Sequence, residues 1–486
     1  MARQFEGKLE RLDGNRWRIP RDASRGMRVD GIIYSSDELI KDVVAGGGLD
    51  QVANVATLPG IVGASLAMPD IHWGYGFCIG GVAAMDIDAG GVISPGGVGY
   101  DINCGVRLLT SDLHADDVRP RMETLTNQVF RDVPCGVGVG GPYTFSGGEI
   151  SRLLNEGMKY LHHRGLASDE DLAATESAGS IGGADVSAVS MEARKRGGDQ
   201  CGTLGSGNHF AEIQYVDQVY DAAAAAAMGL EQGRVTVMIH SGSRGLGHQV
   251  CGDYLKTMQS VPKRYGIDLP DRQLVCAPFD APEAQQYLAA MRAAANFAWC
   301  NRQLLAEQIR KAFSHFFGKS AAQLGMAQVY DVAHNIAKVE TYEINGKMRR
   351  LCVHRKGATR AFGPGSPDLP DRYRDLGQPV LIPGDMGRAS HVLLGTAEAM
   401  RQSFGSTCHG AGRVLSRGEA IRKSAGRRID KELAAMGVIA KSRSREGLAE
   451  EQPAAYKDVD DVVNCVAAAG ISHKVARLRP MGVIKG

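Results

Sequence analysis

The sequence predicts an α+β protein built as one compact catalytic unit, and three observations support this. Strand-like apolar runs and amphipathic helical stretches are mixed along all 486 residues. Glycine-rich loops follow several strand-like runs, and most of these loops carry a histidine. The loops are spread over the whole chain, with no repeat, linker or break in composition between them. A chain of this length usually forms two or three domains, but this distribution predicts a single interleaved unit over residues 1–486.

Composition and charge narrow the class of protein. Apolar residues make up 44% of the chain and charged residues 23%, as in ordinary globular proteins. The formal net charge of +2 does not indicate a general nucleic-acid binder, although local basic clusters are compatible with one. The first residues lack the apolar run of a signal peptide, and no run is long enough to cross a bilayer. The ten scattered cysteines contain no Cys-x-x-Cys pair, so we expect a cytoplasmic protein without a membrane partner.

Periodicity and turn signals predict the elements in chain order. In the first half these are short strands and a helix in the first sixty residues, strands at 79–87 and 106–109, helices at 115–133, 149–164 and 222–227, and a strand at 234–241. In the second half they are a helix at 282–317, a hairpin at 339–353, a strand at 378–383, helices at 396–403 and 458–469, and a charge-rich helical segment at 418–455. We expect Asp280 to cap the long helix, Gly318 to end it, and Asn345-Gly346 to form the hairpin turn. His162 and His163 are interpreted as charges at a helix end rather than metal ligands.

The most unusual stretch is the glycine-rich segment 94–107, which presents Asp101 and Cys104 three residues apart. Glycine adopts backbone conformations that other residues resist, so such a loop suits close approach to a ligand. A carboxylate and a thiolate that face one point can bind a metal ion. Most isolated Asp/Cys pairs are structural, however, and this pair alone does not decide between the two interpretations.

The same design recurs elsewhere, because a histidine lies in or beside each of several glycine loops. These histidines are His72, His209, His240, His354 and His409, and His334 directly precedes a further strand. With Asp101 and Cys104 they could hold one or two divalent cations, although their spacing matches no zinc-finger or zincin motif. Basic residues accompany them at Arg244, Lys356, Arg360, Arg413 and Arg417. Metal ligands combined with phosphate-binding donors favour phosphoryl or nucleotidyl transfer.

In combination, the loops resemble the RtcB family of RNA ligases, which join RNA ends during tRNA splicing and RNA repair. The matching segments follow the family's order from about residue 60 to the C-terminus. They are 69–77, 97–107, 202–209, 240–245, His334-Asn335, 354–360, Cys408-His-Gly-Ala-Gly-Arg413 and 482–486. The runs around Asp101 and around His409 are the most specific.

This resemblance implies an RtcB-like unit whose strand-end loops converge on a dinuclear metal cleft. Cys104 would bridge two Mn(II) ions, with His240 and His334 on one ion and Asp101 and His209 on the other. His409 would be the nucleophile that takes GMP from GTP. The implied guanylate pocket comprises Asn208, Glu212, Asp385, Ser390, His409, Gly410, Ala411, Gly412, Tyr456 and Lys485. The implied RNA-phosphate contacts are Arg196, Arg244, Lys356 and Arg417. Asp385 departs from the serine that some members carry, and segment 418–455 matches no motif.

The implied activity is a GTP- and Mn(II)-dependent RNA ligase that acts through a guanylylated histidine. RNA ending in a 2′,3′-cyclic phosphate or a 3′-phosphate, such as a tRNA half, would be activated with GMP and joined to a 5′-hydroxyl end. The resemblance leaves open whether an archease-type activator is required. One alternative is a metal-dependent RNA phosphodiesterase or phosphatase without nucleotidyl transfer. Another is a metal-stabilised RNA-binding or scaffold protein, which the modest net charge and the low aromatic content (6%) argue against.

Overall fold

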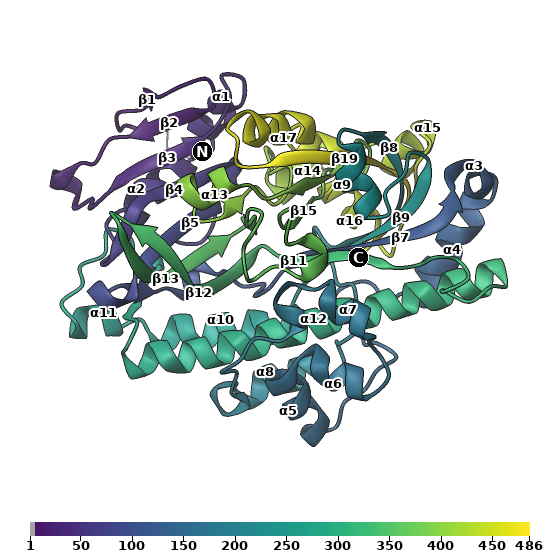
Figure 1. The fold of residues 1–486 in the computed structure, drawn as a ribbon, viewed down its shortest axis with the longest axis horizontal. Helices are drawn as coiled ribbons and strands as arrows, with labels where there is room; N and C mark the ends of the chain where they lie inside the picture. Colours follow the sequence, from purple (N-terminus) through teal and green to yellow (C-terminus); the bar gives the residue numbers. More distant parts are fainter. Residues whose placement is uncertain (1–4) are drawn as a thin grey trace.

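The structure is a computed structural model that describes residues 5–486. Two large sheets occupy the interior of the molecule, and helices surround them (Figure 1). The first sheet has the strand order β1-β2-β3-β4-β5-β13-β12. The bounds of these strands are Glu10–Arg11 (β1), Arg16–Ile19 (β2), Asp30–Tyr34 (β3), Ile61–His72 (β4), Ile79–Asp86 (β5), Lys347–Lys356 (β13) and Asn335–Ile344 (β12).

The second sheet has the strand order β11-β7-β9-β8-β19-β16-β15, and all of these neighbours are antiparallel. A further strand, β18, pairs in parallel with β19. The bounds are Gln328–Ala333 (β11), Gly105–His114 (β7), Arg234–Ser241 (β9), Phe210–Val219 (β8), His473–Lys485 (β19), Ser390–Leu394 (β16), Pro379–Ile382 (β15) and Ile439–Ser442 (β18). Two short pairs complete the strands: Val92–Ile93 (β6) with Ala277–Pro278 (β10), and Thr359–Arg360 (β14) with Ser406–Thr407 (β17).

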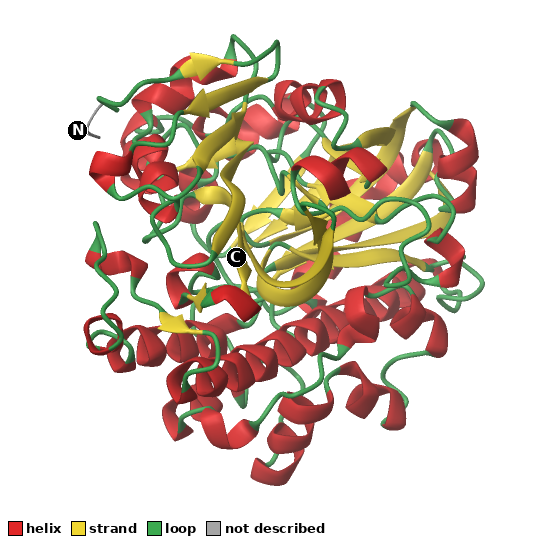
Figure 2. Cartoon of the chain, turned by 60° about the vertical axis from the view of Figure 1, so that its left-hand side comes forward, coloured by secondary structure: helices red, strands yellow, loops and turns green. Residues whose placement is uncertain are grey.

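The long helix α12, Pro282–Phe317, runs along one side of the molecule beneath the strands (Figure 2). Its N-terminal half shares a buried hydrophobic cluster with Met85 of β5, and its C-terminal half shares another with Val237 of β9. The helix therefore packs against both sheets. The other helices are Leu39–Ala45 (α1), Gly48–Val55 (α2), Ala115–Val118 (α3), Met122–Asp132 (α4), Gly147–Glu156 (α5), Met158–His163 (α6), Asp169–Ala173 (α7), Met191–Gly197 (α8), Ala222–Ala227 (α9), Arg244–Thr257 (α10), Val261–Arg264 (α11), Ala397–Gln402 (α13), Arg417–Lys423 (α14), Ile429–Ala435 (α15), Arg445–Glu450 (α16) and Val459–Ala468 (α17).

Most of the predicted elements are present. The strand at 234–241 and the helix at 222–227 have the predicted bounds. Asn345 and Gly346 have φ values of 52° and 74°, as a type I′ hairpin turn requires, and Gly318 ends α12 with a φ of 65°. The expected capping by Asp280 is wrong, because Ala281 occupies the N-cap of α12 and Pro282 begins the helix.

Three predicted helices are wrong in their extent. The helix expected at 115–133 is interrupted by a 3-10 turn at Arg119–Arg121, because Pro120 lacks the N–H that a helix interior needs. The helix expected at 149–164 is two helices separated by Gly157, whose φ of 61° and ψ of −140° favour glycine. The charge-rich segment 418–455 contains β18 as well as helices, because its backbone pairs with β19.

Two further features of the described residues concern disulfide bonds and membrane-spanning helices. The ten cysteines are buried and none of them forms a disulfide. Within residues 5–486, no helix combines the length and the apolar character that a membrane crossing requires.

Candidate active site

The strand order of the second sheet brings the predicted metal ligands together at one end of its strands. Cys104 directly precedes β7 and His209 directly precedes β8, whereas His240 lies near the end of β9 and His334 follows β11. These four strands are antiparallel neighbours in the order β11-β7-β9-β8. Each strand therefore begins where its neighbour ends, and side chains more than 200 positions apart in sequence reach the same place.

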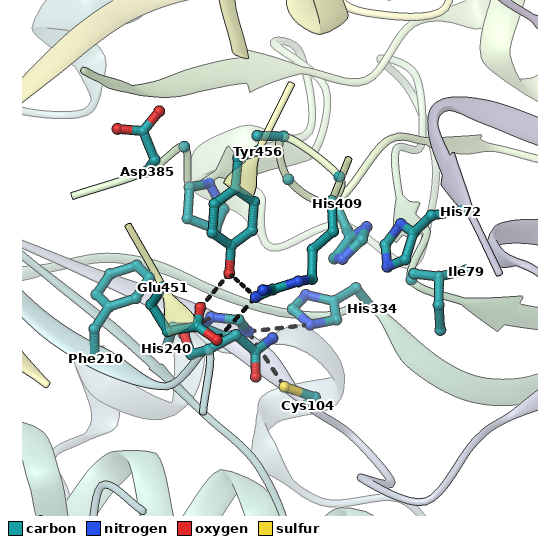
Figure 3. A pocket seen from close by; sticks show the side chains of 18 of the residues that line it. His72, Ile79, Cys104, Phe210, His240, His334, Asp385, His409, Glu451 and Tyr456 are labelled. Carbon is teal, nitrogen blue, oxygen red and sulfur yellow. Dashed lines mark hydrogen bonds and ion pairs between the residues drawn. The ribbon is translucent and has the colours of Figure 1, made fainter. Parts of the chain in front are cut away.

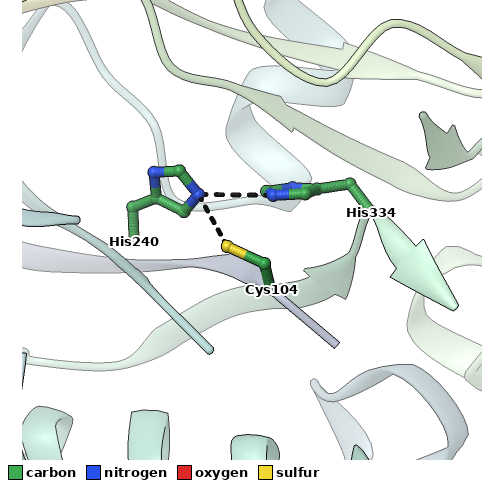
Figure 4. A group of neighbouring side chains, drawn as sticks. All are labelled: Cys104, His240 and His334. Atoms are coloured by element: carbon green, nitrogen blue, oxygen red, sulfur yellow. Dashed lines mark hydrogen bonds between the residues drawn. The ribbon is translucent and has the colours of Figure 1, made fainter. Parts of the chain in front are cut away.

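Cys104 belongs to two groups of side chains that could each hold a metal ion. One group is Cys104, His240 and His334, and the other is Asp101, Cys104 and His209 (Figure 4 shows the first). The Cys104 Sγ lies 3.2 Å from His240 Nε2 and 3.4 Å from His209 Nε2. His240 Nε2 lies 3.3 Å from His334 Nε2, and His209 Nε2 lies 2.8 Å from Asp101 Oδ2. A thiol shared between two such groups is placed to bridge two cations.

The protonation states of this cluster fit metal binding. Burial holds the pKa values of His240 and His334 well below the usual value, so both imidazoles are neutral, as metal ligands must be. The Nδ1 atoms of His209 and His240 lie 3.1 Å and 3.2 Å from the Leu204 and Asn208 carbonyl oxygens, and this directs each Nε2 into the cluster.

Cys104 would need a nearby cation to ionise. Burial raises its pKa well above the usual value, so the protein alone disfavours the thiolate. A cation beside Sγ reverses this preference, because a coordinated thiol loses its proton. The ligand set of thiolate, imidazole and carboxylate therefore fits one or two divalent transition-metal ions.

His409 faces this cluster across the same cavity (Figure 3). Its ring centroid lies 4.8 Å from that of His334. Its Nδ1 lies 2.5 Å from Oδ2 of the fully buried Asp70, and the same oxygen accepts hydrogen bonds from the backbone N–H groups of His409 and Gly410. Burial opposes ionisation of Asp70, but His409 and these N–H groups lower the pKa of Asp70 overall. The contact at Nδ1 leaves Nε2 as the nitrogen available to a ligand in the cavity.

Another part of the cavity wall is a buried network of charged groups around Glu451. Glu451 accepts hydrogen bonds from Arg413 Nη1 (2.9 Å) and from the Tyr456 hydroxyl, and it lies 3.6 Å from Lys485 Nζ. Arg413 Nη1 also donates to the Tyr456 hydroxyl oxygen at 3.0 Å. Burial raises the pKa of the neighbouring Glu212 to about 8 and lowers that of Lys485. The wall thus offers both acceptors and cationic donors to a polar ligand.

The comparisons with known proteins now identify the family. A family model described as "tRNA-splicing ligase RtcB" matches residues 51–486. The chain belongs to the RtcB family. Among the curated relatives, the tRNA-splicing ligase RtcB of Archaeoglobus fulgidus is 53% identical over 482 residues, which cover 99% of this chain and 100% of the relative. The protein of that name from Thermococcus kodakarensis is 52% identical, covering 98% and 99%. The RNA-splicing ligase RtcB of Mycobacterium tuberculosis is 51% identical, covering 90% and 100%.

Most of the site residues that the RtcB resemblance implies do line this one cavity. They are Asp101, Cys104, Asn208, Glu212, His240, His334, Asp385, His409, Gly410, Ala411, Gly412, Arg417, Tyr456 and Lys485. His209 reaches the metal cluster through the contacts given above. Asp385 stands where some members of the RtcB family carry serine. It accepts hydrogen bonds from the Gly387 and Arg388 N–H groups at 2.9 Å and 3.1 Å. Burial raises the pKa of Asp385 to about 6.

Besides His209, four of the implied residues lie outside the cavity lining. The Ser390 hydroxyl accepts a hydrogen bond from Gln214, which also donates to Glu212, so Ser390 reaches the cavity through other side chains. Lys356 is buried and donates to the Tyr75 and Phe77 carbonyl oxygens at 2.5 Å and 3.1 Å. Arg196 is exposed and donates to Gln249, whereas Arg244 Nη1 lies 3.4 Å from His209 Nδ1.

The six histidines of the glycine loops do not all share one role. His354 is buried away from the cavity, and its Nε2 accepts a hydrogen bond from the Ser94 N–H at 3.2 Å. His72 does line the cavity, and burial lowers its pKa to about 4. Sequence reasoning assigned no role to Asp70 or Glu451. The Pro69–His72 match to the RtcB family was a signal for Asp70. The contact between Asp70 and His409 could not be predicted, because the two residues are 339 positions apart in sequence.

A buried ion-pair network fixes the loops that carry Cys104 and His240. Arg302 of α12 forms two hydrogen bonds with Asp331, at 2.8 Å and 2.9 Å, and donates to the carbonyl oxygens of Asn103 and Ser241. Arg107 contacts the same carboxylate at 2.8 Å. Both arginines and Asp331 are fully buried. The network therefore links the long helix to the residue before Cys104 and the residue after His240.

We expect Asp331→Ala to lower the free energy of unfolding by about 3–5 kcal/mol, because it leaves two buried guanidinium groups without a counter-charge. Urea denaturation of the purified protein measures this loss. Asp371→Ala is the control, since Asp371 pairs with Arg374 at the surface and exposed ion pairs contribute about 1 kcal/mol or less. Equal stability of the two variants would contradict the structural role of the network.

Proposed function

We propose that this chain is a GTP- and Mn(II)-dependent RNA ligase. It joins RNA that ends in a 2′,3′-cyclic phosphate or a 3′-phosphate to RNA with a 5′-hydroxyl end, as in tRNA splicing and RNA repair. The observation that carries this proposal is the convergence in one cavity of the Cys104 cluster, the paired His409 and Asp70, and the cationic side chains of Arg413 and Lys485. The whole chain, residues 1–486, acts as one interleaved catalytic unit.

The metal ligands in this proposal are Asp101, Cys104, His209, His240 and His334, with Cys104 shared between two ions. When bound, two Mn(II) ions would stabilise negative charge on the phosphate groups of GTP and RNA. The two overlapping groups of ligand atoms and their neutral imidazoles support this assignment.

His409 is the proposed nucleophile. Its neutral Nε2 attacks the α-phosphorus of GTP, a phosphorus–nitrogen bond forms, and the bond to the β-phosphate breaks with release of pyrophosphate. A 2′,3′-cyclic phosphate is first hydrolysed to a 3′-phosphate. An oxygen of that 3′-phosphate then takes GMP from His409. Finally the 5′-hydroxyl attacks the activated RNA phosphorus, and GMP leaves.

The guanylate contacts are proposed on the part of the cavity wall that holds Glu212 and Glu451. Guanine presents neighbouring N–H donors, and Glu212, whose pKa burial raises to about 8, would be an acceptor suited to them once such a ligand favours its ionised form. The proposed guanylate pocket also includes Asn208, Asp385, Ser390, Gly410, Ala411, Gly412, Tyr456 and Lys485. Arg196, Arg244, Lys356 and Arg417 are the proposed phosphate contacts, of which Arg417 lies in the cavity lining and Lys356 is buried at the end of β13.

Asp70 is proposed as a positioning residue for His409. We expect Asp70→Asn to slow guanylylation roughly 10²-fold or more, because an amide cannot hold the Nδ1–H with a negative charge and keep Nε2 as the nucleophile. Single-turnover labelling with GTP measures the rate, and its dependence on GTP concentration separates binding from chemistry. If Asp70→Asn changes only the KM for GTP and leaves the rate of guanylylation unchanged, this role is contradicted. Asp86→Asn, at a buried aspartate of β5 outside the cavity lining, is the control.

Incubation with α-labelled GTP and Mn(II) tests the proposal against its alternatives. The ligase retains label on the protein, whereas a metal-dependent phosphodiesterase or phosphatase and a non-catalytic RNA-binding protein retain none. Label that is absent from protein with full metal occupancy would overturn the proposal. Adding an archease-type activator to the same reaction determines whether repeated turnover requires one.

A further inference from the structure

Three aromatic rings lie in contact beside the metal cluster and take no part in the proposed metal or guanylate sites. The Tyr100 ring stacks on His248 at a centroid distance of 4.7 Å and an interplanar angle of 29°. Tyr75 meets Tyr100 edge-on at 5.8 Å. Both tyrosines are half-buried and His248 is exposed. We call Tyr75, Tyr100 and His248 the ring stack.

The position of the ring stack ties it to the active site. Tyr100 directly precedes Asp101, so the stack begins at the backbone of a proposed metal ligand. His248 lies on α10, whose first residue, Arg244, directs its side chain toward Thr203 and His209. Arg196 of α8 donates to Gln249, the neighbour of His248, at 2.9 Å. One proposed phosphate contact, Arg196, therefore lies beside the exposed ring.

This combination of features is the one that single-stranded nucleic acid requires. Every base has a π-face, so aromatic side chains bind unpaired bases without sequence preference, and cations beside them follow the backbone. The chain as a whole has few aromatic residues and a net charge of only +2. The ring stack and the neighbouring Arg196 bring both properties to one place, next to the cavity where RNA ends would react.

We propose that Tyr100 and His248 form a platform on which an unpaired nucleobase of the RNA substrate stacks, while Arg196 holds a flanking phosphate. This proposal rests on the proposed function, because it takes RNA as the occupant of the site. Tyr75 supports the platform by packing against Tyr100. One consequence is that the enzyme joins ends with an unpaired nucleotide near the junction better than ends that are fully base-paired.

Two alanine variants test the platform in the full-length protein. Tyr100→Ala and His248→Ala should each weaken binding of a single-stranded RNA with a 5′-hydroxyl or 3′-phosphate end by roughly 5- to 150-fold, measured by fluorescence anisotropy. Tyr100→Phe and His248→Phe keep a ring and should restore binding to within about twofold. If the hydroxyl or the imidazole nitrogens had only a structural role, these two variants would not restore binding. Tyr265→Ala, at an exposed tyrosine after α11, is the matched control.

A double-mutant cycle with the RNA locates the stacked base. An abasic nucleotide is placed in turn at each of the last two positions of either RNA end. At one position the abasic RNA should weaken binding to wild-type protein but cause no further loss with His248→Ala, because the stacked pair is already absent. Additive losses at every position would overturn the proposal, as would RNA binding by His248→Ala that equals wild type.

Labelling by GTP separates this inference from the proposed function, because that reaction needs no RNA. Wild-type protein that fails to take label would refute the proposed function itself. Wild-type protein that labels and joins RNA, together with a His248→Ala variant that binds RNA normally, would refute only the platform. If Tyr100→Ala loses its label because the neighbouring Asp101 is disturbed, His248→Ala alone decides the test, since its side chain is on the surface of α10.

Discussion

Replacing His409 with alanine is expected to reduce guanylylation by on the order of 10³-fold or more, to below detection, because the variant lacks the nitrogen that attacks GTP. The metal content should stay at the wild-type level, since the proposed ligands are unchanged and His409 only packs against one of them, His334, with the two rings tilted by 56°. Labelling with α-labelled GTP and metal analysis of the same sample measure both outcomes. In wild-type protein the label should be lost in acid and kept in alkali, as a phosphorus–nitrogen bond requires.

A second substrate distinguishes loss of one step from loss of the whole site. RNA whose 3′-phosphate already carries GMP bypasses His409, so the variant should still join it to a 5′-hydroxyl end. If His409→Ala instead takes up label from GTP, another histidine carries the chemistry. His72 is then the first candidate, because it lines the cavity, whereas His354 is buried outside it and accepts from the Ser94 N–H.

Replacing Cys104 with alanine is expected to remove both metal ions and to abolish guanylylation and RNA joining together. Cys104 is the residue common to both ligand groups, with Sγ within 3.4 Å of a histidine nitrogen from each. Loss of one ligand from each ion leaves two buried sites without the thiolate that holds them. Metal analysis after dialysis, combined with labelling by GTP and joining of RNA that already carries GMP, measures all three losses.

The control for this variant is Cys276→Ala, which removes a buried thiol of the hydrophobic core and leaves both ligand groups intact. It should keep wild-type metal content and activity. Full metal occupancy in Cys104→Ala would contradict the shared-ligand account. Retention of a single ion with loss of the other would show that Cys104 serves only one of the two groups.

The sequence predicts the components of the site better than their assembly. Asp101 and Cys104 are three residues apart in a glycine loop, so local chemistry alone indicates a metal site there. His209, His240 and His334 join them only because β7, β8, β9 and β11 are antiparallel neighbours with their ends aligned. Strand order is a property of the whole fold, and without the family resemblance no spacing in the sequence would have revealed it.

Other features depend on contacts that sequence patterns do not contain. Asp70 and Glu451 look like ordinary loop carboxylates until the fold places them against His409 and Arg413. The strand at Ile439–Ser442 lies in a segment of helical composition and forms because β19 offers a partner edge. By contrast, Pro120 and Gly157 break their helices for local reasons, and closer attention to these two residues would have predicted both breaks.

The most direct test of the central claim follows the phosphate of the new RNA junction. RNA with a labelled 3′-phosphate is incubated with 5′-hydroxyl RNA, GTP and Mn(II), and a parallel reaction carries the label in the α-phosphate of GTP. We predict that label from the RNA enters the joined product at a junction from which phosphatase cannot remove it, while label from GTP appears as free GMP. Release of the RNA label as inorganic phosphate without joining, or joined product that carries the phosphate of GTP, would contradict the account.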